Sequence, residues 1–295
     1  MIRQIRLYNS KNDMIDFLSN LDFFGISPEG LGVSFDNDLY GSNANFLSGG
    51  KALNGNQFGL QVLFGADGGD PYLRYNEFIK FLNKPPYRLY YETTAGAFYR
   101  DCILSEITKS ELNEYFVLQE NFVLDFTTPF YRWVSNEYEP TPDIAGDGKI
   151  YLDNGGNEHY YVYPFVYESD YNGKNGVFTI KNESVYIGAS VGSPIEITIH
   201  GPCTNPYWEV LLGSTVDQSD GFNLTIAEGY RLVVSSVANE QRARLIAPDG
   251  TVSNVYQQQD LARSNFVTIP EGQSRLIFHN VDKVEFRYRE EWVTV

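Results

Sequence analysis

Three histidines are the side chains of this sequence best suited to metal binding or to acid–base chemistry near neutral pH. They are His159, His200 and His279, and they lie far apart in the chain. None has a second histidine four residues away or a cysteine at the spacing of a zinc site. The GxSxG turn of serine hydrolases is also missing from the sequence. The stretch GADGGD at 65–70 lacks the lysine of a phosphate-binding loop, so we predict a turn there.

Carboxylates are abundant, but their spacing indicates no site. Glu290 and Glu291 are adjacent, and neighbouring side chains of a strand point to opposite faces. The acidic stretches 145–149 (AGDGK) and 152–158 (LDNGGNE) are too irregular for an EF-hand calcium loop and indicate turns. We therefore predict no catalytic residues, no metal ligands and no cofactor, and we expect a protein that is not an enzyme.

Two neighbouring rings, Tyr207 and Trp208, lie directly after the turn-like stretch GPCTNP. Exposed aromatic faces can stack on sugar rings, whereas tryptophan is highly buried on average. The pair is thus either a candidate saccharide contact or part of a core. The first interpretation gives an alternative function, a carbohydrate-binding module that recognises host cell-wall saccharide.

The composition indicates a folded protein with two domains. Its 295 residues are many for a single core, and aromatic residues make up 15% of them. A net charge of −16 without any run of Lys or Arg argues against nucleic acid and membrane partners. We find neither an apolar signal sequence at the N-terminus nor an apolar run that could span a membrane. Cys102 and Cys203 fall in different predicted domains, so we expect no disulfide between them and a reducing compartment during assembly.

The first predicted domain, residues 1–135, contains one well-signalled helix at 70–83. Asp70 is suited to cap it and Pro71 to occupy its first turn. Apolar residues recur on one helical face, at Tyr75, Phe78, Ile79 and Leu82. Three strands are predicted after it, at 87–92, 98–109 and 114–126, with a short hairpin link at 110–113.

Two other parts of this domain are harder to place. In FVLDFTTPFYRW, residues 122–133, alternating apolar residues predict a strand, and Pro129 is expected to end it above a cluster of aromatic rings. Segment 21–56 is rich in Gly, Ser and Asn, which predicts loops around short strands.

The second predicted domain covers residues 149–295 and follows a linker at 136–148. The linker is predicted from Pro, Gly and acidic residues without periodicity. Beyond it, short β-type segments recur at regular spacing with turn residues between them, which is typical of a β-sandwich. The predicted fold class is therefore mainly β, with two domains.

The strands at 98–109 and 114–126 carry apolar residues on both faces, which indicates that both faces are covered. The helix can cover one face, and the other needs the second domain or another subunit. The pattern alone leaves these two possibilities open. If the cover is another subunit, the candidate interface residues are Ile103, Leu104, Phe116, Val117, Val123 and Leu124.

Motifs in both halves resemble those of the distal tail proteins of siphophages. In the first half the resemblance rests on YYETTAGAFYRDCILSEITKSELNEYFVLQENFVLDFTTPFYRW. In the second it rests on YVYPFVY, GVFTIKNES, GSPIEITIHGPCTNPYW, LTIAEGYRLVVSS and FVTIPEGQSRLIF, in that order. Segment 21–56 matches no pattern of that family. The resemblance implies an N-terminal belt domain and a galectin-like C-terminal β-sandwich, where galectin-like describes the fold and not sugar binding.

The resemblance also implies function and partners. Six copies would close into a ring that joins the tail tube to the host-recognition tip, with the aromatic cluster after Phe126 fixing the end of the belt sheet. The expected partners are other copies of the chain, the tail-tube protein and the tail-associated tip protein, and the C-terminal domain is expected to dock receptor-binding proteins. The expected location is the tail of the virion, assembled in the cytoplasm of the bacterial host.

Overall fold

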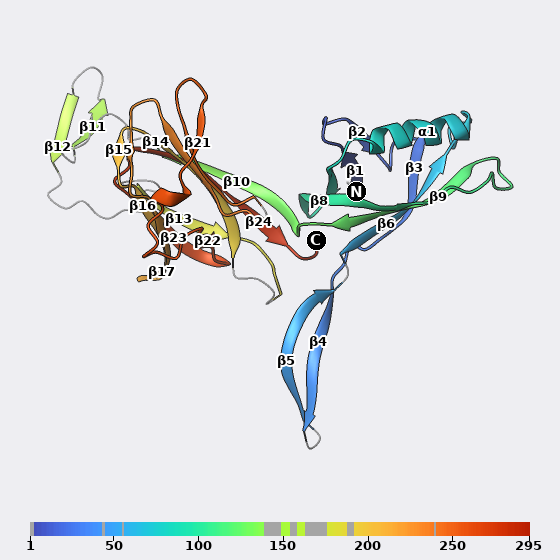
Figure 1. The fold of residues 1–295 in the computed structure, drawn as a ribbon, viewed down its shortest axis with the longest axis horizontal. Coiled ribbons are helices and arrows are strands. Elements are labelled where there is room, and N and C mark those ends of the chain that lie inside the picture. Colours follow the sequence, from blue (N-terminus) through green and yellow to red (C-terminus); the bar gives the residue numbers. More distant parts are fainter. Residues whose placement is uncertain are drawn as a thin grey trace. The chain divides into compact units, whose positions relative to one another are not determined.

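The computed structural model describes residues 3–42, 45–54, 56–138, 149–153, 158–162, 176–187, 192–238 and 240–295. Strands dominate these residues, as Figure 1 shows. The chain divides into two compact units. The first unit comprises Met1–Arg132, Ser184–Ser190 and Glu291–Val295, and the second comprises Trp133–Glu183 and Val191–Glu290.

The first unit is built on one antiparallel sheet with the strand order β2-β1-β7-β8-β9-β6-β3. Its strands are β1 (Arg3–Tyr8), β2 (Met14–Asp16), β3 (Phe23–Glu29), β6 (Gln57–Phe64), β7 (Tyr87–Thr93), β8 (Gly96–Ile107) and β9 (Leu118–Phe126). The backbone N–H of Gly25 in β3 donates to Phe17 O, just after β2, at 2.7 Å, so the two ends of the sheet meet. A Cβ at Gly25 would lie 2.9 Å from Phe17 Cβ, so this approach favours glycine.

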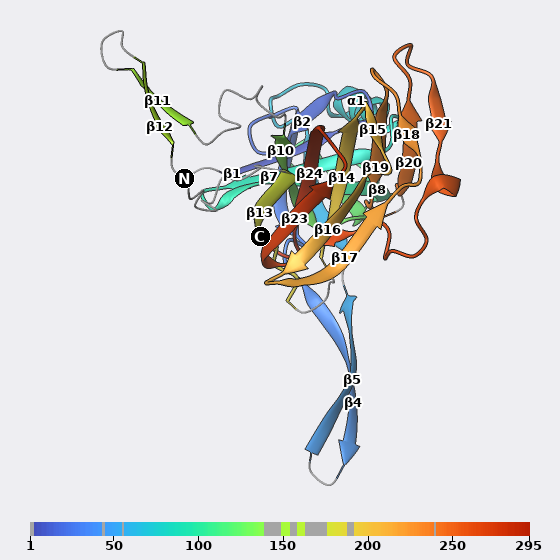
Figure 2. The same ribbon diagram turned by 90° about the vertical axis from the view of Figure 1, so that its left-hand side faces the viewer.

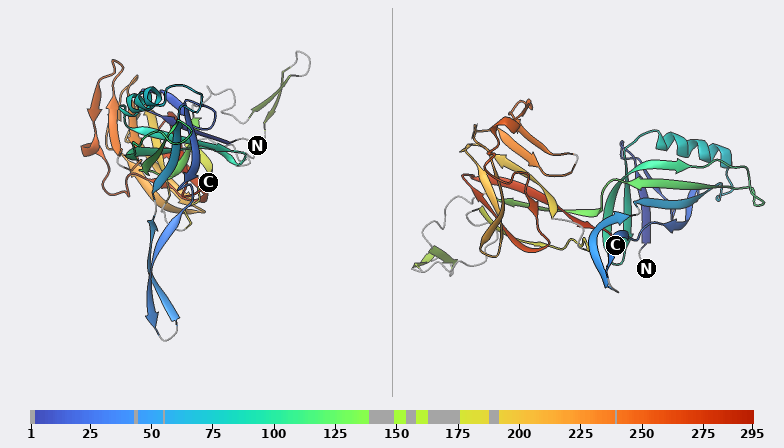
Figure 3. Two further views of the ribbon diagram at one scale, coloured as in Figure 1. Left: turned by 90° about the vertical axis from the view of Figure 1, so that its right-hand side faces the viewer. Right: turned by 60° about the horizontal axis from the view of Figure 1, so that its bottom comes forward.

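Helix α1 (Pro71–Leu82) packs on the sheet of the first unit, as Figures 1 and 3 show. The predicted helix at 70–83 is thus confirmed. Asp70 Oδ1 accepts hydrogen bonds from the backbone N–H groups of Tyr72 and Leu73 at 2.9 and 3.2 Å, the expected N-cap. Phe78 is fully buried and packs edge-on against Phe122 of β9, with ring centroids 5.3 Å apart.

Strand β9 ends at Phe126, and β10 (Phe130–Tyr138) begins four residues later along the same edge of β8. Thr127 and Thr128 hold the turn against that edge: Thr127 N–H donates to Asp101 O at 2.9 Å, and Asp101 N–H donates to Thr128 Oγ1 at 3.0 Å. Pro129 therefore lies at a break between two strands, and the aromatic residue that follows it, Phe130, starts a buried strand. The strand thus ends before Pro129 as predicted, but the aromatic residues after it begin a new strand and do not form a plug beneath an exit loop.

The other predicted bounds shift as well. β8 ends at Ile107 and β9 begins at Leu118, so residues 108–117 connect them instead of the short link predicted at 110–113. Residues 21–56 are not mainly loops. Besides β3, they form β4 (Ser34–Ser42) and β5 (Asn45–Asn54), which pair along their whole length as a separate two-stranded sheet, seen in Figure 2.

The second unit is a β-sandwich. One layer has the order β24-β14-β19-β20-β21, and the other has the order β13-β23-β16-β17. The first layer consists of β24 (Lys283–Trp292), β14 (Ser193–His200), β19 (Arg231–Ser235), β20 (Arg242–Ile246) and β21 (Val252–Asn254). The second consists of β13 (Val177–Asn182), β23 (Gly272–His279), β16 (Tyr207–Leu212) and β17 (Thr215–Gly221). Buried side chains of both layers share one core, in which Phe178 packs edge-on against Phe286 at 4.7 Å between ring centroids.

Smaller elements complete the described part of the second unit. They are β11 (Lys149–Asp153) paired with β12 (Glu158–Val162), β15 (Cys203–Thr204) paired with β18 (Thr225–Ile226), β22 (Thr268–Ile269) paired with β14, and a 3-10 turn at Tyr256–Gln258. Of the predicted linker at 136–148, residues 136–138 are the end of β10 and the rest lie outside the described residues. The predicted domain boundaries at 135 and 149 therefore stay predictions.

Candidate assembly surface

The six predicted interface residues differ in their exposure. Leu124 is fully buried in the core of the first unit, opposite Leu104 of β8. Leu104, Val117 and Val123 are half-buried. Only Ile103 and Phe116 are exposed, at 47% and 77%. Leu124 thus packs within its own unit, and an interface role for the other five stays a prediction.

The connection 108–117 between β8 and β9 is anchored by a buried carboxylate, Glu120, which is 1% exposed. Glu120 Oε1 accepts from Ser110 N–H at 2.6 Å and from Ser110 Oγ at 2.8 Å, and Oε2 accepts from Thr108 Oγ1 at 2.7 Å. Burial raises the pKa of Glu120, but these donors outweigh burial and hold the pKa below its ordinary value. The carboxylate therefore fixes the start of the connection in its charged form.

A tight turn at the end of this connection displays two aromatic rings. Asn113 Oδ1 accepts from the backbone N–H groups of Tyr115 and Val117 at 2.9 and 3.2 Å. Phe116 has a φ of 61°, the left-handed region that is costly for a bulky residue. Tyr115 and Phe116 are nonetheless 75% and 77% exposed, so the turn holds two large rings in water at a cost in backbone energy.

The same connection contacts the first turn of α1. Tyr72 Oη donates to Glu111 at 2.7 Å, and this bond raises the pKa of Tyr72. The Lys109 ammonium lies 4.6 Å from the centre of the Tyr72 ring and 5.0 Å from that of Tyr75. The start of the connection, residues 108–111, is thus held by Glu120 and by the helix.

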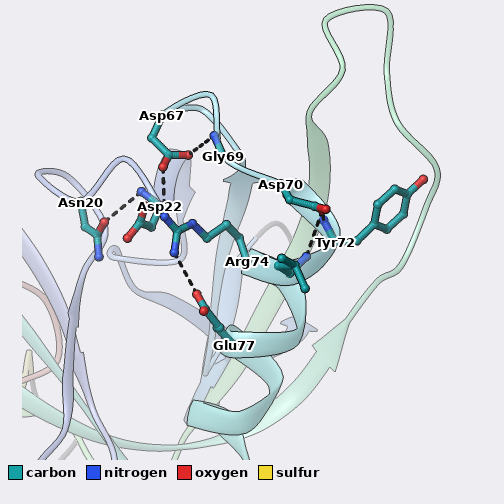
Figure 4. A network of polar contacts seen from close by, with 9 residues as sticks. Asn20, Asp22, Asp67, Gly69, Asp70, Tyr72, Arg74 and Glu77 are labelled. Atoms are coloured by element: carbon teal, nitrogen blue, oxygen red, sulfur yellow. Dashed lines mark hydrogen bonds and ion pairs between the residues drawn. The ribbon is translucent and has the colours of Figure 1, made fainter.

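The glycine-rich loop 65–70 is a turn, as predicted, and Arg74 of α1 holds it, as Figure 4 shows. The Arg74 guanidinium contacts Asp22 at 2.9 Å and Asp67 and Glu77 at 3.1 Å. Asp67 also accepts from Gly69 N–H at 3.0 Å, and this bond together with Arg74 lowers the pKa of Asp67. This network positions the start of α1 against the turn that contains Asp22.

The β4–β5 hairpin, here called the arm, leaves several large apolar side chains exposed. Its exposed apolar residues, between 45% and 74% exposed, are Leu39, Tyr40, Phe46, Leu47 and Leu53. The register pairs Phe35 with Leu53 and places Leu39 and Phe46 farther along the same face. The opposite face carries Asp36 and Asp38 and, nearer the tip, Tyr40 and Leu47. We call this the apolar face of the arm, although it also carries Asn37 and Lys51, whose ammonium lies 3.7 Å from the centre of the Phe35 ring.

The candidate saccharide residues lie in β16. Trp208 is fully buried, packs against Phe222 and has an indole N–H without a partner, so its faces are closed to a ligand. The Tyr207 ring stacks on His279 of β23 with centroids 4.2 Å apart, and the Arg263 guanidinium lies 4.2 Å from the ring centre. β16 lies between β23 and β17 in the sheet. His279 occupies the side of the Tyr207 ring toward β23, and Arg263, which lies beside Gly221, occupies the side toward β17. A saccharide contact at Tyr207 stays a prediction and would require Arg263 or His279 to move.

The reactive side chains do not converge in the part of the chain that the structure describes. Glu290 accepts from Glu183 N–H at 2.9 Å, and Glu291 accepts from Tyr186 Oη at 3.1 Å. Among these residues no three His, Cys, Asp or Glu side chains are grouped to hold a metal ion. Both cysteines are free thiols, and burial raises their pKa values to about 12 for Cys102 and about 11 for Cys203. No described helix is long and apolar enough to cross a membrane.

Comparisons with known proteins agree with this architecture. The chain resembles, over 100% of its own length and of the other chain, a protein in the "Structure of the Phage P2 Baseplate in its Activated Conformation with Ca", with a TM-score of 0.69 and 20% identity. It also resembles the SPP1 Dit protein, whose crystal structure is described as a paradigm of the hub adsorption apparatus in phages that infect Gram-positive bacteria. The TM-score there is 0.63 at 10% identity, and 97% and 98% of the two chains are covered. A search of curated proteins finds no match.

The chain therefore has the two-part, mainly β fold of phage hub proteins, which confirms the predicted fold class. Its residues 4–127 match the family model for "Distal tail protein, N-terminal domain". Residues 4–127 are thus a distal tail protein N-terminal domain, and the chain is a phage tail or baseplate component, as the sequence motifs predicted.

Proposed function

We propose that this protein is a structural ring component of the phage tail tip. Six copies form a ring that joins the tail tube to the tail-associated tip protein and to receptor-binding proteins, after assembly in the host cytoplasm. The protein has no catalytic role in this proposal. The family match at residues 4–127 and the likeness to the P2 baseplate and SPP1 structures support it.

The observation that carries the proposal is the arm. A two-stranded hairpin is at best marginally stable alone in water. The arm pairs with no other strand of the described chain, and its apolar face contains Phe35, Leu39, Phe46 and Leu53. Burying a side chain such as Leu or Phe stabilises by about 1.5–3 kcal/mol, so covering this face supplies several kcal/mol to an assembly. In a ring, a neighbouring copy of the chain can cover the arm of every subunit.

A ring of this kind uses a heterologous contact, in which two different surfaces of each copy meet. The net charge of −16 on each chain opposes the contact, because neighbouring copies repel one another. Screening shortens this repulsion to about 8 Å at physiological salt. Assembly is therefore expected to strengthen as salt rises, and the tail supplies a template for it in the virion.

The test is self-association of the full chain, measured by size-exclusion chromatography with light scattering at rising salt and protein concentration. The Leu39→Ser/Phe46→Ser variant replaces two exposed residues of the arm, so it should fold normally and stay monomeric where the wild type assembles. Leu21→Ser/Leu261→Ser is the matched control, because it replaces two exposed apolar residues elsewhere and should assemble like the wild type. Assembly of the arm variant at the wild-type concentration would contradict the role of the arm. A wild type that stays monomeric at high salt, even with tail-tube and tip proteins added, would refute the ring.

A further inference from the structure

One sheet face of the second unit is basic although the chain as a whole is strongly acidic. In β14, β19, β20, β21 and the part of β24 that pairs with β14, alternate side chains such as Ile197, Val234 and Phe286 point into the core. The residues between them form the outer face. Its charged side chains are the cations Arg231, Arg242, Arg244, Lys283 and Arg287 and the carboxylates Glu196 and Glu285. Five cations against two carboxylates give +3 with His200 neutral, in a chain of −16.

The two carboxylates of this basic face already have partners. Glu196 accepts from Arg242 at 2.5 Å and from Arg287 at 2.9 Å, and Glu285 lies 2.9 Å from His200 Nε2. Arg231 and Arg244 are exposed, and neither pairs with a carboxylate of the described residues. Two guanidinium groups are therefore free to bind carboxylates of another molecule.

The register makes these two arginines close neighbours. Arg231 of β19 lies opposite Ile246 of β20, and Val233 lies opposite Arg244, so the two arginines occupy diagonal positions on adjacent strands. Arg242, two residues before Arg244, is already paired with Glu196 and lies 3.7 Å from Glu240. Like charges this close on one sheet face are unfavourable in the isolated protein. An anionic partner would convert this repulsion into attraction.

The chemistry around the arginines favours a protein over an anionic polymer. Apolar residues lie directly opposite the arginines on neighbouring strands: Ile246 opposite Arg231, and Val233 opposite Arg244. Val252, opposite Ile246, is 54% exposed. Arginine among apolar side chains is typical of protein interfaces. Glu196 and Glu285 lie in the same face and would repel a run of phosphates, whereas a protein can place its own donors against them.

We propose that this basic face binds an acidic protein partner whose carboxylates pair with Arg231 and Arg244 and whose apolar side chains cover Val233 and Ile246. The inference rests on the proposed link between this protein and other tail-tip proteins, and it assigns a surface of the second unit to one of them. The arm belongs to the first unit, so self-association tests the ring separately.

The test uses the full chain and a fluorescent random copolymer of glutamate and tyrosine, which offers both carboxylates and rings. Fluorescence anisotropy should show binding that weakens as salt rises. Arg231→Ser/Arg244→Ser should weaken it by at least about tenfold, as loss of charged pairs at an interface does. Lys11→Ser/Lys80→Ser removes the same charge from two exposed lysines of the first unit and should change the affinity by less than about twofold at physiological salt, where distant charges are screened.

Self-association of Arg231→Ser/Arg244→Ser should match that of the wild type. Unchanged self-association together with lost copolymer binding in this variant would support partner binding by the basic face. That conclusion holds whether or not the ring forms. Equal weakening in both variants would show that only net charge matters and would overturn the proposal. Tighter wild-type binding to poly(glycerol phosphate) than to the copolymer, compared at equal charge, would overturn it in favour of an anionic polymer.

Discussion

Glu120→Gln is expected to loosen the connection that displays Tyr115 and Phe116 while leaving the rest of the first unit folded. The carboxylate accepts three hydrogen bonds, two from Ser110 and one from Thr108, at 2.6–2.8 Å. A glutamine has the same shape but turns an NH₂ group toward one of these donors. Leaving a buried donor unsatisfied costs about 1–3 kcal/mol, so local opening of the connection should become about 5–150 times more frequent.

Amide hydrogen exchange measures this directly, because Ser110 N–H is protected by its bond to Glu120. Protection at Ser110 should fall by that factor, while protection at Leu89 and Phe122, inside the sheet, stays unchanged. The pH dependence gives a second check. The folded-state pKa of Glu120 is lowered, so its stabilisation is complete above the unfolded value of about 4.3 and is lost as pH falls through the folded value. The gap between wild type and variant should be constant from neutral pH to about 5 and should narrow below about 4.3.

Equal protection of Ser110 in the two proteins at neutral pH would refute the anchoring role of Glu120. Ser110 offers a matched control, because Ser110→Ala removes only the hydroxyl donor and keeps the backbone N–H donor. Its effect should be smaller than that of Glu120→Gln, at about 0.5–1.5 kcal/mol. Loss of protection throughout the sheet would instead show that Glu120 stabilises the whole unit.

Two further predictions concern the stability of each unit. Trp208→Ala should destabilise the second unit by about 3–5 kcal/mol in urea unfolding, because it empties a fully buried site; normal stability with lost binding to cell-wall saccharide would instead favour the carbohydrate-binding alternative. Asp70→Ala removes the acceptor that caps α1 and should cost the first unit about 1 kcal/mol, seen as faster amide exchange at Tyr72 and Leu73, and unchanged exchange there would contradict the cap.

Local signals predicted α1 well because each came from residues near one another in the chain. Asp70, Pro71 and the apolar spacing up to Leu82 act within single turns of helix, and the structure uses each of them. The turn at 65–70 was predictable for the same reason. The conformation around Pro129 depends instead on tertiary hydrogen bonds, because Thr127 and Thr128 bind Asp101 of another strand. No pattern within 122–133 encodes that partner.

The sequence did not predict the arm because a register shift interrupts the alternation of apolar and polar residues along its strands. The register shifts between Asp38 and Leu39, and Gly49 is the extra residue in β5, so apolar positions before and after it do not share one period. A Cβ at Gly49 would lie 2.1 Å from the Tyr40 ring, so glycine there leaves room for that ring. The glycines and asparagines that indicated loops thus belong to the bulge and the ends of a long hairpin. Phe35 and Leu39, followed by Phe46 and Leu53 beyond a polar turn, were the signal that could have revealed it.

The apolar pattern of the long strands is explained within the unit on the core face of the sheet. On β9, Phe122 and Leu124 lie in the core, whereas the half-buried Val123 lies on the opposite face together with the exposed Gln119 and Asn121. A second subunit on the face of Val123 therefore stays a prediction. Several of the most exposed large apolar side chains of this unit lie on the arm and on the turn that displays Tyr115 and Phe116.

These two elements are far apart in sequence and different in structure, which bears on the kind of assembly. A two-fold dimer buries the same patch on both partners, whereas a closed ring needs two unlike patches on every copy. The first unit offers an apolar arm in one place and a pair of rings on a strained, anchored turn in another. Each has a cost in the isolated chain, in exposed apolar surface or in the left-handed backbone of Phe116. A ring would use both kinds of surface in every copy, and a two-fold contact through either one would leave the other exposed.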